Sequence, residues 1–90
     1  MNTSLFQYIS DASHGWVKVL KHEIDALGIA EQISSFSYIN RHTGEVYLEE
    51  DCDAPIFLNA YKEKYGDEIR FHETHTEYWW GRDNLSLFSA

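Results

Sequence analysis

Apolar and polar residues alternate with a period of two in several segments, a pattern typical of half-buried β-strands. The clearest example is SFSYI, residues 35–39, and EVYLE, residues 45–49, follows it after a loop in which Gly44 supplies a positive φ. We expect these two segments to form a β-hairpin. Two further strands are predicted at GWVKVL, residues 15–20, and at DEIRFHETHTEY, residues 67–78.

A period near 3.6 indicates a helix in DAPIFLNAYKEKYG, residues 53–66. Pro55 is tolerated only in a first turn, and Gly66 is expected to end the helix. Asp53 is expected to cap its N-terminus. The apolar stripe consists of Ile56, Phe57, Ala60 and Tyr61.

A shorter helix is predicted from about Lys21 to Leu27, because Ile24 and Leu27 share one face and Gly28 ends the pattern. A further turn is expected at residues 30–34.

The expected order is therefore strand, helix, two strands, helix, strand. Two helices on one face of a small four-stranded antiparallel sheet give an α+β fold with the split βαβ, or ferredoxin-like, arrangement. Residues 1–90 are expected to form a single domain. Residues 1–14 are interpreted as an N-terminal arm in which LFQYI is a candidate short strand, and residues 78–90 as a C-terminal tail.

Charge narrows the class of partner. The chain has 15 acids and 7 Lys and Arg residues, for a formal net charge of −8. Phosphate binding needs Lys and Arg, so we expect no direct contact with nucleic acid and none with anionic lipid. A negative surface attracts basic proteins and accelerates their encounter.

One cysteine permits no internal disulfide, which favours a reducing compartment. The N-terminal residues have no basic segment and no long apolar run, so they do not predict a signal peptide. No stretch approaches the ~20 apolar residues that span a bilayer. We therefore expect a cytoplasmic protein with no membrane partner.

Four carboxylates surround the cysteine in LEEDCDAP, residues 48–55. Asp51 and Asp53 suit the N-terminus of the following helix, whose dipole favours negative charge. Glu49 and Glu50 precede that helix and are not needed there. The interpretation that leads to a function is a recognition patch formed by Glu49, Glu50, Asp51 and Asp53.

Two other interpretations of this run are weaker. A calcium loop fails after its first two acids, because Pro55 and Ile56 occupy a ligand position and the glycine position. A nucleophilic Cys52 is opposed by the carboxylates around it, which disfavour a thiolate. We expect Cys52 to be a buried or half-buried structural residue.

HETHTE, residues 72–77, would place Glu73, His75 and Glu77 on one face of a strand and His72 on the other. Such a set could hold a divalent metal, but the spacing is not a zinc signature. We predict neither a metal nor a cofactor. Catalytic motifs with glycine-rich or nucleophile-elbow spacing do not occur, so no catalytic residue is assigned.

Adjacent tryptophans in YWWGR, residues 78–82, point to opposite faces of an extended chain. Trp79, Trp80 and Arg82 belong to the residue types enriched at binding hot spots, and they are candidate anchors for a partner. The alternative is that one tryptophan closes the core and the other lies against the N-terminal arm.

Three segments, DASHGWVKV, LGIAEQISSFSY and VYLEEDCDAPIFLNA, together resemble a family of short uncharacterised proteins common in tailed bacteriophages and prophages. The shared features are HGW, an LGI segment, and YLEEDCD followed by a helix. The resemblance implies an accessory protein that acts inside a bacterial host cell. It implies no catalytic residues.

The leading hypothesis is a small, acidic, non-enzymatic protein that binds a host protein. In a more specific hypothesis, this host protein binds nucleic acid, and the chain inhibits it by presenting phosphate-like negative charge. One alternative is a small metal-dependent or thiol enzyme using Cys52, His72 or His75. Another is a structural domain that self-associates into a homodimer through its tryptophan tail.

Overall fold

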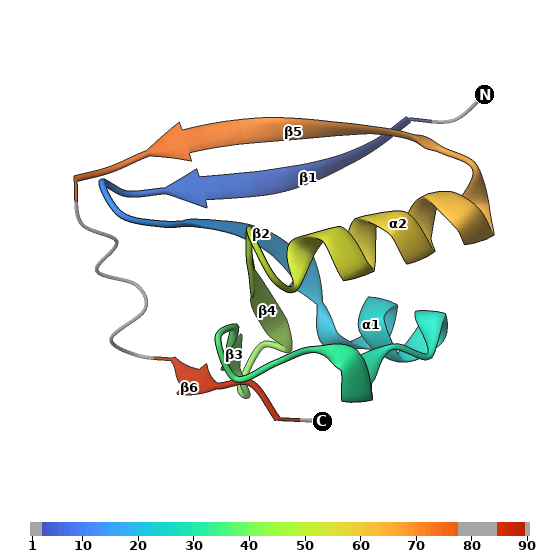
Figure 1. Ribbon diagram of the computed structural model, residues 1–90, viewed down its shortest axis with the longest axis horizontal. Coiled ribbons are helices and arrows are strands. Elements are labelled where there is room, and N and C mark those ends of the chain that lie inside the picture. The colour runs from blue at the N-terminus through green and yellow to red at the C-terminus, as the bar shows by residue number, and fades with distance from the viewer. Residues whose placement is uncertain (1–2, 78–84, 90) are drawn as a thin grey trace.

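The sheet is mixed and has six strands among the residues that the computed structural model describes, which are 3–77 and 85–89 (Figure 1). Its strand order is β5-β1-β2-β4-β3-β6. The strands are β1 (Thr3–Ser10), β2 (Gly15–Leu20), β3 (Tyr38–Asn40), β4 (Glu45–Glu49), β5 (Glu68–His75) and β6 (Ser86–Leu87). The helices are α1 (Lys21–Leu27), the 3₁₀ turn η1 (Ala30–Gln32) and α2 (Ala54–Tyr65).

The α+β class is confirmed, but the strand order differs from the expected one. The N-terminal segment is not an arm, because β1 lies between β2 and β5 and pairs with both. It is antiparallel to β2 and parallel to β5, so the sheet is mixed rather than antiparallel. The expected ferredoxin-like order of four strands is therefore not confirmed.

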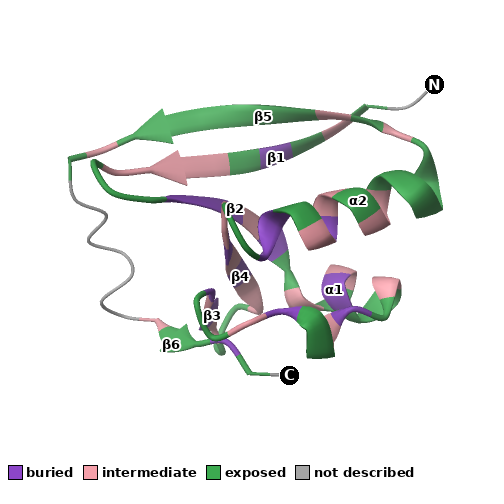
Figure 2. Ribbon diagram, viewed as in Figure 1, coloured by how far each residue is buried: buried purple, intermediate pink, exposed green. Residues whose placement is uncertain are grey.

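The two helices pack on the same face of this sheet. Ile24 of α1 and Phe57 of α2 are fully buried in one cluster with Val17, Val46 and Leu48 of the central strands. Residues of opposite parity in these strands point to the other face, on which none of the described helices lies; we call it the helix-free face. Figure 2 shows that burial is concentrated in β2, β4 and the facing parts of the helices, whereas most of β5 is exposed.

Both helices end where the sequence predicts. Gly28 and Gly66 adopt left-handed conformations, with φ of 70° and 68°, and their N–H groups bond to carbonyls of the preceding turn. Pro55 lies in the first turn of α2, and Lys62 and Lys64 lie in the last. In the described part of the chain, no helix has the length and apolar character needed to cross a bilayer.

The end of the chain returns to the sheet. Strand β6 pairs antiparallel with β3, and the N–H group of the buried Phe88 donates to the carbonyl oxygen of Ser37. The candidate anchors Trp79, Trp80 and Arg82 lie outside the described residues.

Candidate functional site

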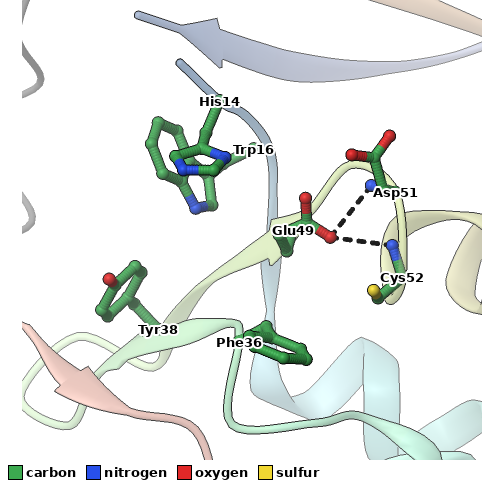
Figure 3. Close-up of a pocket in the computed structure, with 7 residues that line it drawn as sticks. All are labelled: His14, Trp16, Phe36, Tyr38, Glu49, Asp51 and Cys52. Carbon is green, nitrogen blue, oxygen red and sulfur yellow. Dashed lines mark hydrogen bonds between the residues drawn. The ribbon is translucent and has the colours of Figure 1, made fainter.

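A hollow of about 300 Å³ opens at one end of β2 and β4, on the helix-free face of the sheet (Figure 3). Its wall combines aromatic rings with two carboxylates and the cysteine. The lining residues are His14, Trp16, Phe36, Tyr38, Glu49, Asp51 and Cys52. They come from three separate segments of the chain, residues 14–16, 36–38 and 49–52, and the fold brings these segments together.

Strand pairing explains why aromatic and acidic groups meet here. Trp16 of β2 lies directly opposite Glu49 of β4, so their side chains share the helix-free face. The rings of His14 and Trp16 have centroids 5.9 Å apart, and those of Trp16 and Tyr38 are 6.5 Å apart. These three rings form a continuous aromatic wall.

Glu49 shapes the acidic side of the hollow. Its Oε2 atom accepts hydrogen bonds from the backbone N–H groups of Asp51 and Cys52, at 3.0 and 2.8 Å. The carboxylate therefore fixes the turn that follows β4. Figure 3 shows it between the His14 and Trp16 rings on one side and Cys52 on the other.

Asp53 has a different role from the one expected. It is 1% exposed, and its side chain makes no capping bond to α2. Its Oδ1 atom accepts from the N–H group of Ser34 at 3.1 Å, and Oδ2 accepts from the hydroxyls of Ser34 and Ser37 at 2.8 and 2.5 Å. The predictions of a side-chain cap and of a surface charge at Asp53 are both wrong, because a carboxylate with three donors nearby is better satisfied inside.

These bonds tie two walls of the hollow together. Ser37 also accepts a hydrogen bond from the N–H group of Glu49, at 3.0 Å. The loop that carries Phe36 is thus joined both to β4 and to the turn that carries Asp51. We call Asp53, Ser34 and Ser37 the buried clamp.

Glu50 faces away from this hollow. Its Oε2 atom accepts a hydrogen bond from the Tyr8 hydroxyl, and it borders a second hollow on the helix side of the sheet. Burial, followed by this hydrogen bond, raises the pKa of Tyr8 to about 12. The Tyr8 side chain crosses directly over Gly15, where a Cβ atom would collide with it and lie 2.9 Å from Glu50. This explains the glycine of the HGW motif.

Cys52 is exposed, so the expectation of a buried or half-buried thiol is wrong. Its backbone belongs to a surface turn rather than to α2. Local desolvation, then the hydrogen bond and charge of Glu49, and the charges of Asp53 and Asp51 raise the pKa of the Cys52 thiol. The site therefore lowers the fraction of thiolate, the form that reacts as a nucleophile.

The histidine strand does not assemble a cluster. His72, Glu73 and His75 lie in β5 and are exposed, and Glu77 lies beyond the end of that strand. The Nδ1 atom of His75 is 2.9 Å from the hydroxyl oxygen of Ser10. Within residues 3–77 and 85–89, no three His, Cys, Asp or Glu side chains are grouped closely enough to hold a metal ion.

The structure thus divides the expected acidic patch. Glu49 and Asp51 share the hollow, Glu50 lies on the other face, and Asp53 is buried. Sequence reasoning did not assign His14, Phe36 or Tyr38 to a site. The alternation within β2 and β3, which puts Trp16 and Tyr38 on the face opposite Val17 and Ile39, was a usable signal, but the position of Phe36 depends on the buried clamp. Comparison with protein-family models, curated proteins and solved structures found no match to this chain.

Proposed function

We propose that this protein is a non-enzymatic binding module that recognises a basic segment of a host protein. The observation that carries the proposal is the hollow in which Glu49 and Asp51 face an aromatic wall. Among the residues that the structure describes, none that lines this hollow is Lys or Arg. Aromatic side chains supply contact area, and carboxylates select a positively charged partner.

The net charge of −8 supports the same class of partner over a longer range. A field of this sign accelerates encounter with a basic protein and opposes encounter with a phosphate backbone. Proteins that bind nucleic acid carry basic surfaces, so they are suitable partners, and occupation of such a surface would inhibit them. The resemblance to phage accessory proteins leads to the same proposal, with a bacterial cell as the setting.

The test measures association kinetics with a purified partner, first captured from bacterial lysate. Asp51 is the residue to change, because the carboxylates of Glu49 and Glu50 hold the backbone and Tyr8. Asp51→Lys should slow association about tenfold at low salt, and the effect should shrink at high salt. Asp51 is exposed, so unfolding stability should change by only about 0.5 kcal/mol.

Glu63→Lys is the matched control. It makes the same change in net charge as Asp51→Lys, and Glu63 is exposed on α2 about 15 Å along the helix from its N-terminus. We expect this variant to slow association by less than about twofold. Equal slowing by both variants would attribute the effect to overall charge, and no slowing by Asp51→Lys would exclude this face.

A further inference from the structure

We infer that the hollow beside Glu49 binds an arginine side chain of the partner, with the planar guanidinium against the aromatic wall and its charge near Glu49 and Asp51. The inference rests on the proposed function, because it names the chemical group that the same surface takes. Four properties of the hollow carry it: size, ring arrangement, charge and rigidity.

The size fits a single side chain. The hollow holds about 300 Å³, the lower end of the range of roughly 300–1,000 Å³ for small-molecule sites. A large cofactor would not be enclosed by it. One long side chain from a protein surface would fill much of it while the partner backbone stays outside.

The rings are arranged to receive a cation. Attraction between a cation and an aromatic ring acts within about 6 Å of the ring centre. The His14, Trp16 and Tyr38 rings line one side with centroid separations of 5.9 and 6.5 Å, and Figure 3 shows Phe36 on a different side of the hollow. Trp16 is 2% exposed and packs behind this side, so the exposed His14 ring and the half-buried Tyr38 ring are the ones that a ligand contacts. Phe36 is 67% exposed, which leaves a large apolar ring available for contact.

The charge of the hollow selects a positive group. Glu49 and Asp51 lie in its wall, and the lining residues within 3–77 and 85–89 include no lysine or arginine. The same carboxylates act on the neighbouring thiol: after desolvation, the hydrogen bond and charge of Glu49 and the charges of Asp53 and Asp51 raise the pKa of Cys52. A neutral ligand would gain no charge–charge attraction from these carboxylates.

The hollow is held open in advance by the buried clamp. Asp53 binds Ser34 and Ser37, and Ser37 binds the N–H group of Glu49, so the wall with Phe36 cannot move independently of β4. A preformed site pays less ordering entropy on binding.

Arginine fits this site better than lysine. Guanidinium is planar, weakly hydrated and able to stack on rings while bonding to carboxylates. A lysine ammonium is compact and strongly hydrated, so it loses more hydration free energy when it packs against aromatic rings.

The test uses three small probes that need no partner: N-acetyl-arginine amide, N-acetyl-lysine amide and the uncharged isostere N-acetyl-citrulline amide. Each is titrated at pH 8 into the ¹⁵N-labelled protein while amide shifts are recorded. Arginine should produce saturable shifts at residues 14–16, 36–38 and 49–52. Its affinity should exceed that of lysine severalfold and that of citrulline about tenfold or more.

Three variants locate the interaction. Phe36→Ala and Asp51→Asn should each weaken arginine binding about threefold to tenfold. Leu5→Ala should leave it unchanged, because Leu5 is similarly exposed, at 68%, but lies near the opposite end of the sheet face. Equal binding of citrulline, equal or tighter binding of lysine, or shifts elsewhere would each overturn the inference.

The two proposals fail separately. If arginine does not bind but Asp51→Lys still slows partner association, the inference fails and the proposed function stands. If arginine binds here but Asp51→Lys does not slow association with the partner, the hollow binds a guanidinium and the proposed host-protein interface is wrong.

Discussion

At the scale of single residues, Asp53 has the greatest structural role of the four acids around Cys52, although the sequence predicted a helix cap at this position. Asp53 immediately precedes α2, which is the expected position of a cap. Its real donors, Ser34 and Ser37, lie 19 and 16 residues earlier in the chain. A local pattern could not reveal them, because the meeting depends on how the loop before β3 folds against the turn after β4.

We predict that Asp53→Ala lowers the free energy of unfolding by about 3 kcal/mol, measured by urea denaturation. A lost cap alone costs about 1 kcal/mol, whereas hydrogen bonds to a buried charge are worth about 1.5–3 kcal/mol. The variant also leaves the Ser34 and Ser37 hydroxyls without this acceptor.

Two companion variants make the result interpretable. Asp53→Asn keeps one side-chain oxygen acceptor and should be less destabilised than Asp53→Ala. Asp51→Ala, exposed and two residues away, should change stability by only about 0.5 kcal/mol. A loss near 1 kcal/mol for Asp53→Ala, no larger than a missing cap, would contradict the clamp.

At the scale of elements, the predictable features are those with local causes. Both α-helices were predicted with nearly correct ends, because Gly28, Pro55 and Gly66 act within a few residues of themselves. The hairpin of β3 and β4 was predicted for the same reason, with Gly44 at φ 79° in its loop.

Strand β1 was underestimated because its role is non-local. It was expected to be an arm, but it pairs in parallel with β5, whose residues lie about 65 positions later: Ser4 opposes Ile69 and Ser10 opposes His75. Parallel pairing needs a long connection and leaves no turn signal next to the strand. Its alternating residues Phe6 and Tyr8 were the available clue.

We predict that Phe6→Ala lowers the free energy of unfolding by about 3–5 kcal/mol. Phe6 is 7% exposed, and its ring makes edge contacts with Phe57 at 5.5 Å and Tyr61 at 5.2 Å. Leu5→Ala is the neighbouring control on the other face, and we expect a change of about 0.5 kcal/mol or less. Thermal or urea denaturation measures both, and similar losses in the two variants would contradict the assignment of β1 to the core.

At the scale of the whole molecule, the two faces of the sheet have different tasks. Both helices cover one face and build the core, whereas the other face carries the hollow, which is lined by the buried Trp16 and the half-buried Tyr38 and Glu49. The acidic composition predicted that a partner would be positively charged, but it did not predict where on the surface the partner would bind. Only the folded sheet shows that Glu49 and Asp51 belong together while Glu50 belongs elsewhere.

This layout also predicts how stability is distributed. Strands β2 and β4 each have a partner on both sides and contain fully or almost fully buried side chains, such as Val17, Val46 and Leu48. Strand β5 is at an edge, pairs only with β1 among the described strands, and is mostly exposed. Segments with few buried contacts open with lower free energy than the core.

We therefore predict that amide hydrogens of β2 and β4 exchange only through global unfolding, while those of β5 exchange about tenfold faster or more. Hydrogen exchange followed by NMR, with denaturant added in small steps, measures both rates. The β2 and β4 amides should respond to denaturant as strongly as global unfolding, and the β5 amides should respond weakly. Equal exchange rates and equal denaturant responses in β5 and β2 would contradict this prediction, because they would mean that the edge strand opens only with the core. If the rates became equal only at high protein concentration, the result would favour self-association that covers β5.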